Sequence, residues 1–269
     1  MRVITSQGDK DFGSNVTVNL NNQNRIKSSF LRSNDPRVVQ LANSLFTLQW
    51  FLERRENEVV GFSQDERIAI EHTIGKALEG RVISLEEGTR AYVSTYLQKP
   101  ELAKKSPKQM FEGVRDGGQF ESIFDTGISA EKFVIAFQTR RCVEGFLRQL
   151  SNSKRKKARG VNCDKEFVAL LGVDLLAKQP DKMEALTLSG TEFLCAIVFA
   201  SLGEKTPDSL LSELQTGDFT ALKDSLSLIF DFAAARPTEA RKRWSTLFQS
   251  QTFFERVVNY SRQRKLAST

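Results

Sequence analysis

The chain has 269 residues, a formal net charge of +6 and an isoelectric point near 9.2, with ordinary globular proportions of hydrophobic (40%) and charged (27%) residues. No apolar run reaches the roughly 20 residues of a membrane-spanning helix, and the three cysteines are too widely spaced for a zinc site or a disulfide framework. The basic balance favours anionic partners, such as nucleic acid or a membrane surface.

Residues 1–34 differ from the rest of the chain. They are polar, rich in asparagine and poor in helix formers. A short alternation of Val16, Val18 and Leu20 is the strand-like pattern in this segment. We expect a flexible N-terminal arm, which either is a disordered tail or docks on a neighbouring subunit.

From Asp35 onward, helix start signals recur along the chain. Asp35-Pro36 predicts an N-cap followed by a proline in the first helical position. The pairs Ser63/Glu66, Ser84/Glu87 and Ser189/Glu192 have the spacing of a capping box. Apolar residues at helical spacing follow these starts, and no convincing strand pattern appears after residue 34. We therefore predict an all-α, two-lobed, multi-helix globular protein that carries a flexible N-terminal arm.

The stretch SNSKRKKARG, residues 151–160, marks the expected boundary between the lobes. Five cations fall within six residues there, with no acid among them, directly after the helix predicted to begin at Ser129. We expect a flexible arm over 1–34, an N-terminal helical lobe over 35–152, a basic connector over 153–160 and a C-terminal helical lobe over 161–269.

The sequence contains no recognised catalytic motif. Metalloprotease, P-loop, Rossmann and nucleophile-elbow patterns are all absent. The single histidine, His72, lies within a predicted helix, where a structural role is the ordinary one. The paired carboxylates Asp65-Glu66 and Glu86-Glu87 fall in first turns, where the helix dipole favours them. We expect no enzymatic activity, no catalytic residues, no metal site and no cofactor.

Clustered cations are the strongest functional signal. The helix dipole explains two or three of them at most, so the stretch is either a solvated loop or a polyanion-binding surface. A second basic cluster precedes Trp244, whose ring either stacks on a base or lies in the core. The candidate nucleic-acid-binding residues are Arg140, Arg141, Arg148, Lys154, Arg155, Lys156, Lys157, Arg159, Arg241, Lys242 and Arg243.

A helical body, a positive cleft and an exchange arm together resemble the general design of viral nucleoproteins. We therefore expect a cytoplasmic, sequence-tolerant protein that binds and packages single-stranded nucleic acid, RNA rather than DNA, and that forms homo-oligomers through its arm. Two alternatives stay open. One is a helical protein-binding adaptor or regulatory factor, for example a bacterial secretion-associated one; the other is a peripheral membrane or matrix protein with its basic face on anionic lipid.

Overall fold

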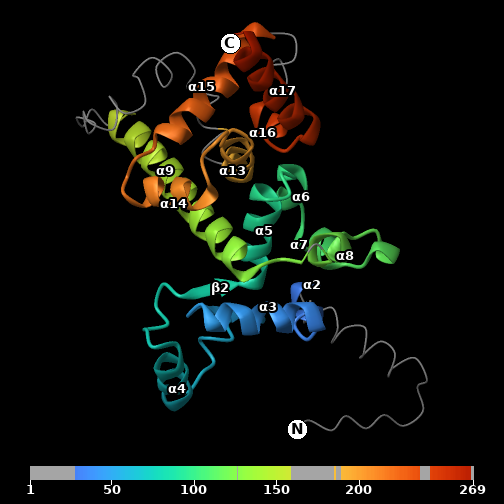
Figure 1. The fold of residues 1–269 in the computed structure, drawn as a ribbon, viewed down its shortest axis with the longest axis vertical. Helices are drawn as coiled ribbons and strands as arrows, with labels where there is room; N and C mark the ends of the chain where they lie inside the picture. The colour runs from blue at the N-terminus through green and yellow to red at the C-terminus, as the bar shows by residue number, and fades with distance from the viewer. Residues whose placement is uncertain (1–27, 126, 159–184, 186–188, 237–242, 268–269) are drawn as a thin grey trace.

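The structure is a computed structural model that describes residues 28–125, 127–158, 185, 189–236 and 243–267 (Figure 1). These residues are mostly helical, which confirms the predicted all-α, multi-helix globular fold. The described chain begins with α2 (Ser28–Leu31). Next to this helix, Arg32 Nε donates to the Phe111 carbonyl at 3.0 Å, so the last residues of the predicted arm pack on the body. Residues 1–27, the remainder of that arm, lie outside the described residues.

The elements follow one another in short steps. The first half of the chain comprises α3 (Pro36–Thr47), β1 (Phe51–Glu53), α4 (Gln64–Ile74), β2 (Val82–Ser84), α5 (Leu85–Thr95), α6 (Pro100–Lys104), α7 (Pro107–Phe111), the 3-10 turn η1 (Val114–Asp116) and α8 (Phe120–Phe124). The long α9 (Ala130–Ala158) follows, and the second half comprises α13 (Thr191–Ala200), α14 (Pro207–Gln215), α15 (Thr220–Ala235), α16 (Trp244–Leu247) and α17 (Gln251–Ala267).

Several helix starts lie where the sequence predicts them. The Asp35 carboxylate accepts the Arg37 backbone N–H at 3.0 Å and caps α3. Ser63 and Glu66 form a complete capping box at the start of α4. The Ser84 hydroxyl accepts the N–H of the residue three positions later and caps α5. These bonds join near neighbours in the chain, which is why their spacing predicts them.

Two short strands were missed by the sequence analysis. β1 and β2 pair in parallel, with Phe51 opposite Val82 and Glu53 opposite Ser84. Each strand has three residues, too few for a period-two pattern to emerge. The pair joins the end of the α3 segment to the start of α5, and so positions α5 in the centre of the first half.

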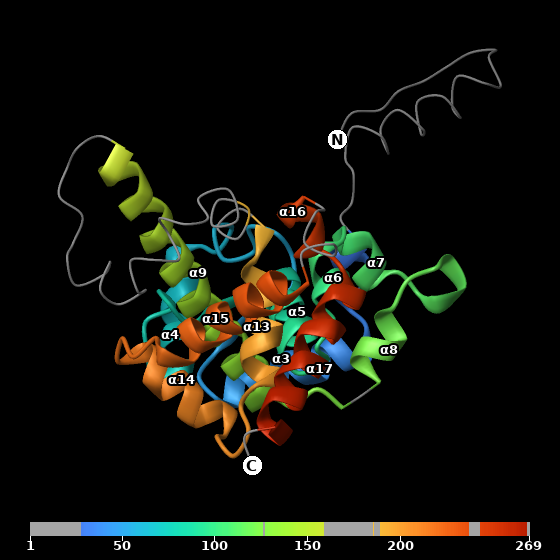
Figure 2. The same cartoon turned by 90° about the horizontal axis from the view of Figure 1, so that it is seen from above.

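α9 connects the two halves of the molecule. It runs diagonally between the layer of α3 and β2 and the group formed by α13, α14, α15 and α17 (Figure 1). The helix continues to Ala158, so the stretch predicted as the connector is helical as far as that residue. Lys and Arg are good helix formers and are favoured near a helix C-terminus, which explains this continuation. The last turns of α9 extend beyond the neighbouring helices (Figure 2).

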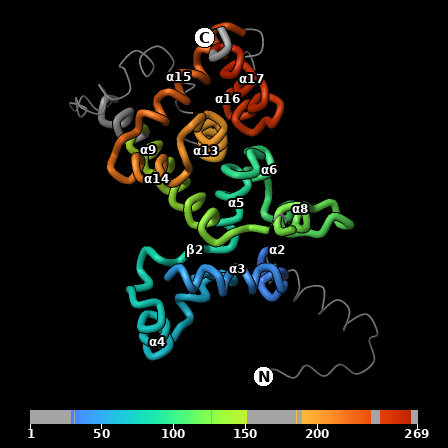
Figure 3. Tube along the Cα trace, in the orientation of Figure 1, coloured from blue at the N-terminus to red at the C-terminus, as the bar shows by residue number. Residues whose placement is uncertain are grey.

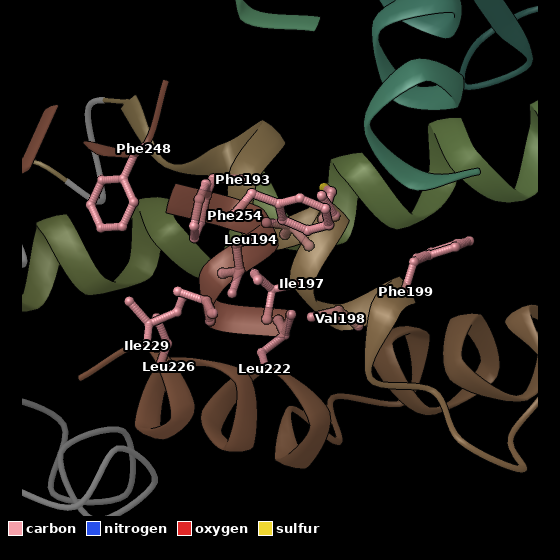
Figure 4. Packing of buried hydrophobic residues seen from close by; sticks show 14 of the residues in the cluster. Phe193, Leu194, Ile197, Val198, Phe199, Leu222, Leu226, Ile229, Phe248 and Phe254 are labelled. Atoms are coloured by element: carbon pink, nitrogen blue, oxygen red, sulfur yellow. The ribbon is translucent and has the colours of Figure 1, made fainter. Parts of the chain in front are cut away.

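Two apolar clusters fill the interior, and α9 contributes to both. The first cluster gathers residues from α3, α5, α7 and α8 around Phe133 and Phe137 of α9. The second gathers α13, α14, α15, α16 and α17 around Val143, Phe146 and Leu150 of α9. Figure 4 shows the centre of the second cluster, where residues of α13 meet residues of α15 and α17. The labelled side chains are Phe193, Leu194, Ile197, Val198, Phe199, Leu222, Leu226, Ile229, Phe248 and Phe254.

α4 projects from the body. It lies apart from the helical core at one end of the molecule (Figures 1 and 3). The sequence predicts that Ile68 and Ile74 lie on the apolar face of this helix and that Gly80 stops it. In the structure Ile74 is its only buried residue and Ile68 is 54% exposed. The helix ends earlier, at Gly75, whose φ of 70° is left-handed.

No helix among the described residues has the length and apolar character to cross a membrane.

Candidate functional site

Of the predicted basic residues, the structure describes the side chains of four: Arg140, Arg141, Arg148 and Arg243. Arg141 and Arg148 are exposed on α9, and Arg141 lies 5.6 Å from the ring centroid of Phe137. Arg243 is exposed and precedes α16. Lys154, Arg155, Lys156 and Lys157 lie on the last two turns of α9, of which only the backbone course is described. Arg159, Arg241 and Lys242 lie outside the described residues.

Arg140 points into the protein rather than towards solvent. Its side chain is 12% exposed, and its guanidinium lies 2.8 Å from Glu144 Oε1 and 3.2 Å from Glu192 Oε1. Burial opposes the charge, but the two carboxylates outweigh burial, and the pKa of the Arg140 guanidinium is raised. Arg140 is therefore engaged in an internal ion cluster.

Trp244 also lies in the interior. The residue is 8% exposed and packs against Phe230, Phe248 and Phe253, with ring centroids 5.5 to 6.2 Å apart. The base-stacking interpretation of this ring is therefore wrong, because its faces are covered by other aromatic rings. The core interpretation is the one that the structure shows.

Glu192 is the residue whose role the sequence analysis assigned wrongly. In the structure the N-cap of α13 is Gly190, and no side chain caps this helix. The Glu192 side chain is 5% exposed and lies between two cations, Arg140 of α9 and Lys104 of α6, whose Nζ is 3.7 Å from Glu192 Oε2. Its cationic partners lie 52 and 88 positions away in the chain, so no local spacing could have revealed them.

A thiol lies beside this ion cluster. Cys195, one turn further along α13, is fully buried. Burial raises the pKa of the Cys195 thiol far above its usual range, although the nearby Arg140 charge acts in the opposite direction. The Cys195 thiol is therefore unreactive as long as it stays buried.

A pocket of about 480 Å³ runs along α15, between the end of α13 and α17. Its charged lining residues include Lys205, Asp224, Asp231 and Arg264. Arg264 pairs with Asp231, and Lys205 Nζ donates to both carboxylate oxygens of Glu213 at 2.8 Å. The volume lies within the range of small-molecule sites, and Lys205, Asp231 and Arg264 on its wall each have an ion-pair partner.

A second pocket, of about 360 Å³, lies at the carboxyl ends of β1 and β2. Its lining includes Glu53, Arg54, Ser84 and Glu86. In the part of the chain that the structure describes, no group of three or more His, Cys, Asp or Glu residues is placed to hold a metal ion.

Comparison with known families gives one match. The model of the family described as "AIPR protein" matches residues 1–262. Comparisons with curated proteins and with solved structures gave no significant match. The family match contradicts the expectation of an RNA-packaging nucleoprotein, and it gives no support to the regulatory adaptor. Charge clustering describes a surface and carries no information about ancestry. The basic stretches and the polar arm therefore could not distinguish this family from a nucleoprotein. Because the match spans nearly the whole sequence, the chain belongs to the AIPR family.

Proposed function

We propose that this chain takes part in the resistance of bacteria to phage by abortive infection. The family name stands for abortive infection phage resistance. The observation that supports the proposal is the match of the family model to residues 1–262, which leaves only the last seven residues outside it. In abortive infection an infected cell dies or stops growing before phage progeny are released, so the surrounding population survives.

We further propose that the protein acts in the cytoplasm, where phage genomes are replicated, and by binding rather than by catalysis. The pairing of Arg264 with Asp231 and of Lys205 with Glu213 around the α15 pocket supports a binding role. A catalytic site would instead set a nucleophile within hydrogen-bond reach of a general base.

The test is infection of a phage-sensitive bacterium that expresses the chain, against a panel of unrelated phages. At a low ratio of phage to cells, we expect fewer plaques than with the empty vector and survival of the culture. At a high ratio, we expect the culture to collapse with a reduced burst of phage.

A core variant provides the matched control. Phe193 is fully buried and its ring packs against Phe248, Phe253 and Phe254, so Phe193→Ala removes the fold without touching the surface. This variant is expected to lose protection. Equal plaque counts and equal bursts with and without the chain, for every phage in the panel, would contradict the proposed function. Continued growth of the infected cells themselves would contradict the abortive mechanism.

A further inference from the structure

Several contacts between the α6 segment and the second half of the molecule are polar. Lys104 of α6 pairs with Glu192 of α13. The Gln251 backbone N–H, at the start of α17, donates to Glu101 Oε2 at 3.1 Å, and its side-chain amide donates to the Gln98 carbonyl at 3.1 Å. We call this set of contacts, together with Arg140, the seam. It lies between the two apolar clusters and differs from both in composition.

The seam is also where hydrogen bonding is incomplete. Among the described residues, four buried side-chain atoms have no hydrogen-bond partner: Thr139 Oγ1, Arg140 Nε, Glu192 Oε2 and Gln251 Oε1. Three of these atoms belong to seam residues, and the fourth belongs to the neighbour of Arg140. A buried polar network that is only partly satisfied stabilises a contact less than an apolar contact of the same area would. The seam is therefore expected to hold the two halves together less strongly than an apolar contact of the same area would.

One face of α13 rests on this seam. Glu192 contacts Lys104, and Phe199 lies edge-on to Tyr96, the tyrosine at the end of α5, at a centroid distance of 5.2 Å. Residues three and four positions apart share a helix face, so Cys195 lies on the same face, between these two contacts. The thiol is thus covered by the elements that the seam joins.

We propose that the seam opens reversibly: this face of α13 moves away from α5, α6 and the Arg140 turn of α9, and the Glu192 carboxylate keeps it closed. Glu192 is suited to this role because it binds one cation from each neighbour, Lys104 of α6 and Arg140 of α9. Loss of its charge leaves Lys104 without this partner and Arg140 with Glu144 as its remaining carboxylate. Opening leaves most of the second apolar cluster in place, because Phe193 and Leu194 on the other faces of α13 keep their own partners (Figure 4).

Alkylation of Cys195 measures the opening directly. The native protein is treated with iodoacetamide over a series of low urea concentrations, and labelling of Cys195 is followed peptide by peptide by mass spectrometry. Opening of the seam exposes little surface, so the labelling rate is expected to change little with urea until global unfolding takes over. Glu192→Gln is expected to raise the rate in this flat range at least about tenfold.

Two further variants make the result decisive. Lys104→Gln removes the partner on α6, whose side chain is 30% exposed, and is expected to give a smaller rise in the same range. It decides the question if Glu192→Gln does not fold. Glu213→Gln is the matched control, since it removes a carboxylate from the ion pair with Lys205 on the far side of the second half, and it is expected to leave the rate unchanged.

Two results would overturn the inference. One is a wild-type Cys195 that labels only with the full urea dependence of global unfolding. The other is a flat-range rate that neither Glu192→Gln nor Lys104→Gln raises. The measurement involves no phage, so its outcome is independent of the outcome of the infection experiment.

Discussion

Gly88 of α5 lies directly against the ring of Phe133 of α9. A methyl group at position 88 would sit 2.3 Å from Phe133 Cε1 and 2.8 Å from Ile83 Cγ2, both far inside van der Waals contact. Both neighbours are fully buried and have no room to retreat. Because Gly88 has no side chain, α5 and α9 can approach closely. This close approach allows the first apolar cluster to form around α9.

The first prediction concerns this contact. Gly88→Ala is expected to lower the free energy of unfolding by about 1–3 kcal/mol, because the added methyl overpacks the core. Gly145→Ala, in the middle of α9, is the matched control: an added methyl there meets nothing within 4 Å. This second change is expected to raise the free energy of unfolding by about 0.5–1 kcal/mol, since alanine favours the helix. Urea unfolding of both variants checks the pair, and the same sign for both would contradict it.

The second prediction concerns the Asp35 cap. Side-chain hydrogen bonds from Arg37 lower the pKa of the Asp35 carboxyl, although burial opposes them. A lowered pKa means that the stabilisation is complete above the usual pKa of aspartate, about 4, and is lost as the pH falls through the folded value. Asp35→Asn keeps the cap but loses the charge. The difference in stability between wild type and this variant is therefore expected to shrink below about pH 4.

Asp35→Ala separates the cap from the charge. It loses both, so at neutral pH it is expected to be less stable than Asp35→Asn by about 1 kcal/mol. Both effects are measured by thermal or urea unfolding of the three proteins between pH 3 and pH 7, at steps of about one pH unit. A difference between wild type and Asp35→Asn that grows as the pH falls would contradict the assignment.

The third prediction concerns α4, which projects from the body with one buried residue. A helix with so little tertiary packing depends on its own capping interactions. Removing the Ser63 cap by Ser63→Ala is expected to speed hydrogen exchange of the α4 amides about fivefold, while the amides of α5 and α9 exchange as in the wild type. A uniform increase over the whole protein would show that α4 is coupled to the core.

The fourth prediction concerns Trp244. Trp50→Phe leaves Trp244 as the single tryptophan of the chain. Because Trp244 is 8% exposed among aromatic rings, its emission is expected to be blue-shifted and poorly quenched by acrylamide. Quenching as efficient as in the urea-unfolded variant would contradict its place in the core.

The residues that sequence analysis placed correctly act on near neighbours. Asp35 and Ser63 bond to backbone groups two and three positions away, and their spacing alone predicts the caps. Glu192 has the same spacing relative to Ser189, yet its side chain turns inward to cations from α6 and α9. In the sequence, a residue that caps a helix and a residue that pairs with a distant cation can have the same spacing. Only the burial of the side chain in the structure distinguishes them.

The basic stretch illustrates a different limit. The run of cations without an acid predicts a connector at Lys154 to Lys157, but the backbone there is the end of α9. Helix propensity and the helix dipole both favour these residues in that position. The division of the chain into an arm, two lobes and a connector stays a prediction, and so does the role of the basic residues.

The sharing of α9 between the two apolar clusters has a consequence for how the protein is inherited. A chain cut after residue 152 would leave its first piece with Val143, Phe146, Leu147 and Leu150 facing water in one continuous strip. The second piece would lack one wall of its interior. Neither piece would keep a complete core if recombination moved it alone into another gene. The described body is therefore expected to be inherited as one unit.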